Sequence, residues 1–174
     1  MRFKYLSVTE VISTFIETRF YTEASREIGS EAHKECYNYL TNKPFDSEND
    51  YISSLVSWSK IVNPVVISAE ERFFDDKLRY CGQPDFIGRI KGLEGIGIID
   101  FKTSKSRQNH WKMQVSAYAM LATPKYGNIS WASTMRLRKE GKMPFFDFCF
   151  VGSTAKKEPK SFLNFKTLLS LIGG

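Results

Sequence analysis

The apolar residues of this chain first recur at helical spacing and later change to the alternation that is typical of strands. At the start, Ser7 to Glu10 has the pattern of a capping box, in which a serine and a glutamate three residues later cap a helix. Pro44 and Pro64 are expected to limit the two helical stretches that follow. The helices predicted in this part of the chain cover residues of about 8 to 20, 23 to 41 and 48 to 62.

From Val65 onward, β-branched and aromatic residues form short apolar runs that turn residues separate. Glycine-containing turns at 91–95 and 139–142 predict two hairpins. Two further helices are predicted, one stopped by Pro124 and one covering the end of the chain. The strands predicted here cover residues of about 65 to 74, 79 to 91, 95 to 102, 129 to 137 and 145 to 151, and the helices cover about 107 to 123 and 161 to 172.

This order of elements predicts an α/β fold. The hairpin at 79–102 and the strands within 129–151 would build a central mixed sheet, flanked by the N-terminal helices and by the helix at 107–123. With 174 residues and 42% hydrophobic content, the chain is long enough for one well-packed core. We therefore expect a single domain over residues 1–174.

The sequence predicts an intracellular protein without a membrane partner. The first 25 residues contain no apolar run of signal-peptide length, and nowhere do about 18 apolar residues follow one another, as a membrane span requires. Cys36, Cys81 and Cys149 stand far apart without a C-x-x-C pair, which argues against a disulfide framework, a zinc ribbon or an iron–sulfur cluster. These cysteines are expected to be buried thiols.

The net charge of +6 and the isoelectric point near 9.2 suit a polyanionic partner such as nucleic acid. Because many basic proteins bind no nucleic acid, the charge indicates a class of partner without identifying it.

The segment from Gly95 to Lys105 carries the strongest chemical signal. Within an otherwise apolar strand, Asp100 and Lys102 are two residues apart, so both side chains lie on one face and the neighbouring apolar side chains point to the other. Charged groups in a buried strand are costly unless they are paired or bind an ion. Taken alone, this pattern also fits a salt bridge at the end of a strand.

Asp85 lies on the strand that the predicted hairpin brings alongside Asp100, so the two carboxylates can converge. Hard oxygen ligands at short distance suit Mg²⁺ or Mn²⁺. Lys102 could then hold an attacking water or offset charge on a phosphate. Glu70 or Glu71 could supply a third carboxylate, and Glu70 is favoured, with its neighbour facing away by strand alternation. The residues therefore predict a metal-dependent hydrolytic site.

Five short motifs occur in a fixed order along the chain. They are G-x-x-x-H at Gly29 to His33, a strand that begins with glutamate, G-x-x-D at Gly82 to Asp85, D-F-K-T at Asp100 to Thr103 and Q-x-x-x-Y at Gln114 to Tyr118. This arrangement resembles the RecB-like branch of the PD-(D/E)xK nuclease superfamily. The segment from Leu6 to Ile12 is also similar to the start of phage and mitochondrial genome-maintenance-type exonucleases of that branch.

The resemblance implies a restriction-endonuclease-like core and assigns roles to individual residues. Asp85 and Asp100 would bind the metal, Lys102 would be the catalytic lysine, and the backbone carbonyl of Phe101 would be a further ligand. His33 would complete the metal site from the helical side. By residue type alone, a single helical histidine is more often a packing residue.

The remaining assignments concern assistance and substrate binding. Glu70 would assist through the metal or its bound water, and Gln114 and Tyr118 would position their helix against the active site and the DNA backbone. By spacing alone, these two residues also fit an ordinary amphipathic helix edge. Lys105, at the end of the segment around Asp100, is expected to bind substrate. Members of the branch with an iron–sulfur cluster use four cysteines, so no cluster is expected here.

The sequence therefore predicts a Mg²⁺- or Mn²⁺-dependent DNA exonuclease acting in DNA recombination or repair, located in the host cytoplasm if it is encoded by a phage. Exonuclease action is favoured by the resemblance, by the lack of a recognisable sequence-reading module and by the basic charge. Two alternatives remain open. One is a metal-dependent endonuclease on DNA or RNA, and the other is a non-catalytic DNA-binding module in which Asp100 and Lys102 form a salt bridge.

Overall fold

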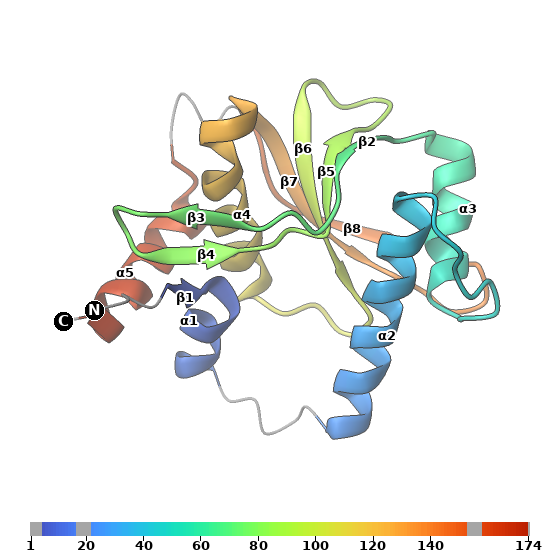
Figure 1. The fold of residues 1–174 in the computed structure, drawn as a ribbon, viewed down its shortest axis with the longest axis horizontal. Helices are drawn as coiled ribbons and strands as arrows, with labels where there is room; N and C mark the ends of the chain where they lie inside the picture. The colour runs from blue at the N-terminus through green and yellow to red at the C-terminus, as the bar shows by residue number, and fades with distance from the viewer. Residues whose placement is uncertain (1–4, 17–21, 153–157, 174) are drawn as a thin grey trace.

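A five-stranded mixed sheet forms the centre of the molecule (Figure 1). The computed structural model describes residues 5–16, 22–152 and 158–173. The sheet has the order β2-β5-β6-β7-β8, and only the β6–β7 pair is parallel. Its strands are β2 (Val65–Ser68), β5 (Phe86–Arg89), β6 (Ile96–Lys102), β7 (Ile129–Arg136) and β8 (Phe145–Val151). This mixed α/β arrangement confirms the fold class expected from the sequence.

Helices cover both faces of the sheet. One apolar core joins one face to three helices, and a second core joins the other face to the remaining two (Figure 1). The first set is α1 (Val8–Phe15), α4 (Trp111–Tyr126) and α5 (Lys160–Gly173). The second set is α2 (Glu23–Leu40) and α3 (Ile52–Val62). Ile98 packs in the first core, whereas Ile99 and Phe101 pack in the second, so β6 alternates its side chains between the two layers.

A separate three-stranded sheet, β1-β4-β3, lies beside α4 and was not expected from the sequence (Figure 1). Its strands are β1 (Leu6–Ser7), β3 (Phe73–Asp75) and β4 (Tyr80–Gly82). The predicted strand at 65–74 is therefore divided between two sheets, and so is the predicted strand at 79–91. Pro84 explains the second division, because proline has no N–H to donate to a strand ladder.

The first and third helices differ in length from their predictions. The capping box is present, since Ser7 Oγ accepts from Glu10 N at 3.1 Å and Glu10 Oε2 accepts from Ser7 N at 2.8 Å. However, α1 ends at Phe15, because Ile16 is extended, and residues 17–20 of the predicted helix lie outside the described residues. The helix α3 starts at Ile52 rather than 48, because Asn49 Oδ1 accepts from the backbone at its start.

The helix α4 does not stop at Pro124, contrary to the prediction. Pro124 lies inside the last turn, and the helix continues to Tyr126 before Gly127, whose φ is 73°. A proline removes one hydrogen bond and its ring crowds the carbonyl four residues earlier, and so close to the helix end both costs fall on the last turns alone. The same helix begins at Trp111 rather than 107, since residues 103–110 form a loop.

Cysteine burial also departs from expectation at one position. Cys36 and Cys81 are buried thiols, whereas Cys149 is only half-buried. None of the helices in the described part of the chain combines the length and the apolar character that a membrane crossing requires.

Candidate active site

Asp100 and Lys102 lie at the end of β6, beneath α4. Asp100 is only 2% exposed, and Lys102 Nζ lies 2.6 Å from its Oδ2 atom. Burial raises the pKa of Asp100, and the Lys102 ammonium group opposes that shift. Apart from this ion pair, Asp100 Oδ2 has no hydrogen-bond partner among the described residues. A buried carboxylate oxygen with so few donors is the kind of atom that a cation stabilises.

The register between β5 and β6 brings Asp85 to Asp100. Phe86 pairs with Ile99 in this antiparallel ladder, so Asp85 falls opposite Asp100, one step beyond the last pair. The Phe101 backbone N–H donates to Asp85 Oδ2, which fixes the carboxylate beside β6. Asp85 is 8% exposed. Two acidic side chains from adjacent strands are therefore buried side by side.

His33 reaches the same place from α2. Its Nδ1 atom lies 3.0 Å from Asp85 Oδ1, and its ring meets the Phe101 ring edge-on. Burial disfavours the imidazolium, but the charge of Asp85 and the hydrogen bond to it dominate and raise the pKa of His33 to about 9. Gly29 of this helix faces the loop that follows β6, and an added Cβ there would make an ordinary contact, 3.7 Å from Thr103 Oγ1.

Glu70 and Glu71 face different surroundings. Glu70 lines the same hollow as His33, and burial followed by the Asp85 charge raises its pKa. Glu71 instead contacts Lys125 and Tyr126 on α4. The sequence suggested that strand alternation would separate these two side chains, but alternation is not the reason. The connection between β2 and β3 is irregular, and Glu70 has left-handed backbone geometry with φ of 49°.

A chain of hydrogen bonds connects Lys102 to α4. Lys102 Nζ donates to Gln114 Oε1 at 2.9 Å, and Gln114 Nε2 donates to the Tyr118 hydroxyl at 3.0 Å. Burial raises the pKa of Tyr118, and the charge of Asp100 adds to that shift. Gly82 makes room for this helix, because a Cβ there would lie 2.7 Å from the Tyr118 ring. Gln114 and Tyr118 thus fix the position of the Lys102 ammonium group.

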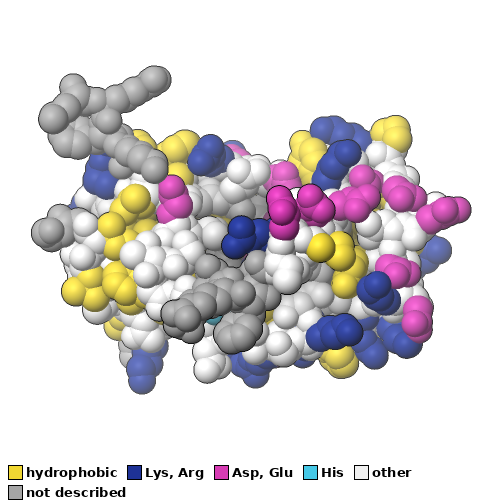
Figure 2. Space-filling view, turned by 90° about the horizontal axis from the view of Figure 1, so that it is seen from below, with side chains coloured by type: hydrophobic (Ala, Val, Ile, Leu, Met, Phe, Trp, Pro, Cys, Tyr) yellow, Lys and Arg dark blue, Asp and Glu magenta, His cyan; other side chains and the backbone are white. Residues whose placement is uncertain are grey.

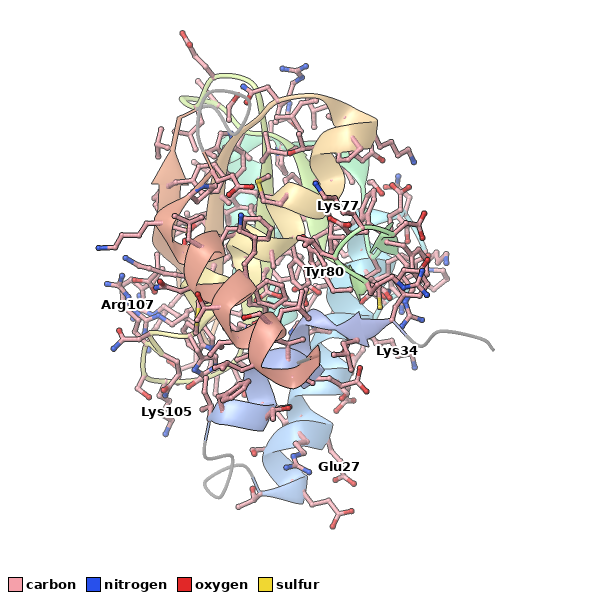
Figure 3. All side chains as sticks on the ribbon, turned by 90° about the vertical axis from the view of Figure 1, so that its left-hand side faces the viewer. Glu27, Lys34, Lys77, Tyr80, Lys105 and Arg107 are labelled. Atoms are coloured by element: carbon pink, nitrogen blue, oxygen red, sulfur yellow. The ribbon has the colours of Figure 1, made fainter. Side chains whose placement is uncertain are left out.

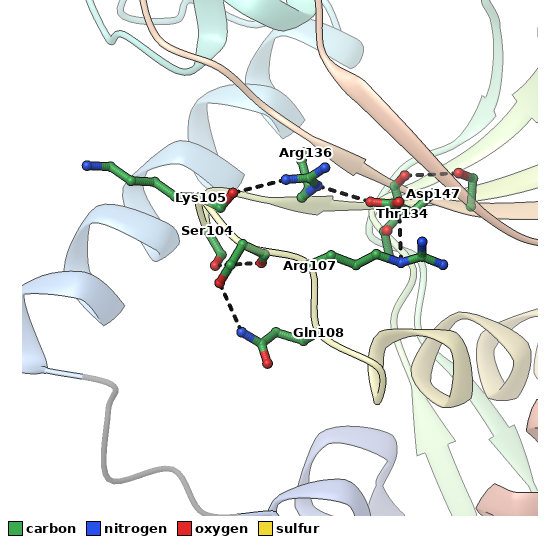
Figure 4. A network of polar contacts seen from close by, with 9 residues as sticks. Ser104, Lys105, Arg107, Gln108, Thr134, Arg136 and Asp147 are labelled. Carbon is green, nitrogen blue, oxygen red and sulfur yellow. Dashed lines mark hydrogen bonds and ion pairs between the residues drawn. The ribbon is translucent and has the colours of Figure 1, made fainter.

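Lys105 is not part of this buried cluster. It lies in the loop of residues 103–110, and its exposed side chain points outward (Figures 3 and 4). Its backbone carbonyl accepts a hydrogen bond from Arg136 at 3.0 Å. The structure therefore brings eight of the nine predicted site residues together and places Lys105 at the periphery.

A cavity of about 420 Å³ opens directly beside this cluster. His33, Lys102 and Gln114 line it, and Trp111 and His110 line it from the start of α4. The Trp111 ring centroid lies 5.7 Å from Lys102 Nζ. Trp111 was not predicted as a site residue, although its helical spacing to Gln114, Val115 and Tyr118 could have indicated it.

Thr9 is a second site residue that was not predicted from the sequence. It lines the cavity from α1, and its hydrogen bond opposes the upward shift of the Tyr118 pKa. No spacing rule connects Thr9 to α4, because the two helices meet only through the tertiary fold.

The donor set fits a small divalent cation. The two carboxylates, the Phe101 carbonyl and the His33 imidazole, once the ring has given up its extra proton, are hard or borderline ligands of the kind that Mg²⁺ and Mn²⁺ accept, with water completing the shell. Within residues 5–16, 22–152 and 158–173, no three His, Cys, Asp or Glu side chains are already grouped around one point. Asp85 is paired with His33 and Asp100 with Lys102, so a cation would compete with both partners.

Comparison with solved structures identifies a neighbour for the whole fold. The chain is similar to an alkaline exonuclease from Laribacter hongkongensis, with a TM-score of 0.50 and 11% sequence identity over 98% of this chain and 86% of that one. No family model matches the sequence, and no curated protein matches it. At this identity the likeness establishes the fold, which is restriction-endonuclease-like, and the case for an activity depends on the side chains of the site.

Proposed function

We propose that this chain is a Mg²⁺- or Mn²⁺-dependent DNA exonuclease of the PD-(D/E)xK superfamily, in its RecB-like branch. The observation that carries the proposal is the burial of Asp85 and Asp100 side by side, with Lys102 on the same strand two residues later. The order of the sequence motifs and the fold shared with an exonuclease support the same function.

In this proposal Asp85, Asp100, the Phe101 carbonyl and His33 hold the cation. When bound, the cation would acidify a water molecule and offset the charge of the scissile phosphate. Lys102 orients the water or the phosphate oxygen, because its ammonium group is held at the cavity wall by Gln114. Tyr118 holds Gln114 in turn, and Glu70 supplies a further carboxylate beside His33.

The proposed substrate is DNA. The net charge of +6 favours a polyanion, and Figure 2 shows that charges are not evenly mixed on the face seen there. An acidic row lies at the upper right of that face, and Lys and Arg side chains lie both above and below it. The basic side chains offer surface for phosphate groups.

A non-catalytic DNA-binding module of the same fold is the second candidate. The 2.6 Å contact between Lys102 and Asp100 is the salt bridge that this reading requires. His33 and the Phe101 N–H partner Asp85 in the same way, but this reading gives no reason for burying two carboxylates side by side, which is costly. The nuclease proposal accounts for all three side chains.

The experiment that tests the proposal compares linear DNA with covalently closed circles of the same sequence, in single- and double-stranded forms, with Mg²⁺ present. We expect linear DNA to be degraded to short products while the circles persist. Equal rates on circular and linear single strands would leave a metal-dependent endonuclease. Binding without any hydrolysis would favour the non-catalytic module.

A further inference from the structure

A second cavity, of about 280 Å³, lies next to the first one. Thr103 and Ser104, which directly follow Lys102, line both cavities. The walls of the second cavity come from the loop of residues 103–110, the end of β7, the turn that joins β7 to β8, the start of β8, and Tyr51 just before α3. A polymeric ligand that leaves the candidate active site past Thr103 would therefore enter the second cavity.

The lining of this second cavity is strongly basic. Its basic residues are Lys105, Arg136, Arg138, Lys139 and Lys142, and no Asp or Glu lines it. Three of the five are ion-paired, Arg136 with Asp147, Lys139 with Asp50 and Lys142 with Glu140. Lys105 and Arg138 have no ion-pair partner among the described residues. These two cations are therefore available to a ligand.

Aromatic rings hold several of these cations in place. The guanidinium carbons of Arg136 and Arg138 lie 5.0 Å and 4.4 Å from the centroid of the Phe145 ring. The ammonium nitrogen of Lys139 lies 5.6 Å from the centroid of the Tyr51 ring. Phe145 is 48% exposed, although it is a large apolar residue. Exposed rings beside cations are typical of surfaces that bind unpaired nucleotides.

The loop that carries Lys105 is anchored by polar contacts (Figure 4). Asp147 pairs with Arg136 at 3.0 Å and with Arg107 at 3.4 Å. Arg136 also donates to the Lys105 carbonyl at 3.0 Å. Because the backbone at Lys105 is fixed to β7 and β8, its ammonium group is presented from a defined position, which lowers the entropy cost of binding.

We propose that this second cavity, which we call the basic groove, binds the single DNA strand that continues from the active site. The inference rests on the proposed function. Lys105 and Arg138 neutralise backbone phosphates, and Phe145 and Tyr51 contact unpaired bases. A single strand is the occupant because its bases are free to meet these rings, whereas a duplex keeps its bases stacked inside. The shared lining at Thr103 and Ser104 makes the path continuous.

The test measures binding of a fluorescent 20-nucleotide single strand, and of a blunt duplex of equal length, in chelator so that no hydrolysis occurs. The variants are Arg138→Gln, Phe145→Ala, the two combined, and Phe145→Leu, which keeps apolar bulk without a ring. Lys77→Gln is the matched control, because Lys77 is exposed in the β3–β4 turn and lies apart from Lys105 and Arg107 in Figure 3. Thermal unfolding verifies that each variant is folded.

We expect the combined Arg138→Gln and Phe145→Ala variant to bind the single strand at least about tenfold more weakly. The slope of log affinity against log salt should become shallower by about 0.7 for the lost phosphate contact. Phe145→Leu should lose part of the affinity without a change in slope. Lys77→Gln should bind like the wild type.

Two outcomes would overturn the basic groove. In the first, the Arg138 and Phe145 variants bind the single strand with the same affinity and the same salt slope as the Lys77→Gln control. The other is a loss of duplex affinity as large as the loss for the single strand. A wild type that binds DNA through these residues and never cleaves it would refute the nuclease proposal while supporting the groove.

Discussion

The candidate active site and the basic groove both collect charge, but they differ in burial. The side chains of Asp100 and Lys102 are 3% and 17% exposed, whereas those of Lys139 and Lys142 are 55% and 54% exposed. Buried charges are costly to desolvate and interact strongly, so a chain keeps them where they do chemistry or form a specific pair. Exposed charges are individually weak and screened by salt, and they contribute affinity collectively.

This difference predicts that the two regions can be separated by mutation. Changes in the buried cluster should lower the rate of hydrolysis and leave the affinity for a single strand in chelator almost unchanged. Changes in the basic groove should weaken the affinity for a single strand and leave the rate of the hydrolytic step almost unchanged. The loop of residues 103–110 connects the two regions and belongs to both.

The largest effect is expected at the acidic pair. Replacing Asp85 or Asp100 by Asn keeps the shape and removes ligand charge, so the rate of DNA hydrolysis should fall at least about a thousandfold, or roughly 4 kcal/mol of transition-state stabilisation. Single-turnover rates on end-labelled DNA measure the change, and thermal unfolding verifies the fold. A near-normal rate in either variant, with metal affinity unchanged, would move the site elsewhere.

Lys102→Ala should be the next most damaging change, with a loss of about a hundredfold or more in rate. Metal binding should be largely retained, because the lysine acts on water or phosphate rather than on the cation. Lys102→Arg should rescue poorly, since the guanidinium fork is bulkier and cannot occupy the place that Gln114 defines. Full activity of the arginine variant would replace water positioning with a simple charge role.

Gly82→Ala should lower stability, and any loss of rate should come through the displaced Tyr118. Its Cβ would lie 2.7 Å from the Tyr118 ring and 2.9 Å from Leu121, so α4 must shift or repack. Overpacking of this kind costs about 1 to 3 kcal/mol of unfolding free energy. Denaturant unfolding provides the measurement, and Gly29→Ala offers a contrast, because the Cβ added there makes only an ordinary contact, 3.7 Å from Thr103 Oγ1. Equal stability of the Gly82→Ala variant and the wild type would show that α4 is free to move.

The smallest effect is expected at Gln114, which positions Lys102 rather than contacting the phosphate. Gln114→Ala should lower kcat about tenfold with little change in KM, because the ammonium group loses one of its two polar partners. Gln114→Glu, which keeps an acceptor at the same place, should recover most of kcat. If KM rises while kcat is unchanged, Gln114 binds substrate and does not position the lysine.

Much of the fold could be predicted from the sequence because its signals are local. The capping box of α1, the β5–β6 hairpin and the β7–β8 hairpin each follow from residues that are close in the chain. The small β1-β4-β3 sheet could not be predicted in this way. It depends on the break at Pro84 and on pairing between β1 and β4, whose residues Leu6 and Tyr80 are far apart in the chain.

The candidate site shows the same division. The neighbourhood of Asp85 and Asp100 follows from hairpin register, and the common face of Asp100 and Lys102 follows from strand periodicity. Thr9 and the groove residue Phe145 reach their places only through tertiary packing, so no local pattern marks them. The side on which Glu70 lies depends on one left-handed residue in a connection that sequence reasoning treated as a strand.

The central claim is that hydrolysis requires a cation held by Asp85 and Asp100. Removal and add-back of the metal test this claim most directly. Protein dialysed against a chelator is incubated with end-labelled linear DNA, first without metal and then with Mg²⁺, Mn²⁺ or Ca²⁺ added back. We predict no product without metal, full recovery with Mg²⁺ or Mn²⁺, and little hydrolysis with Ca²⁺. Undiminished cleavage by the metal-stripped protein would contradict the account.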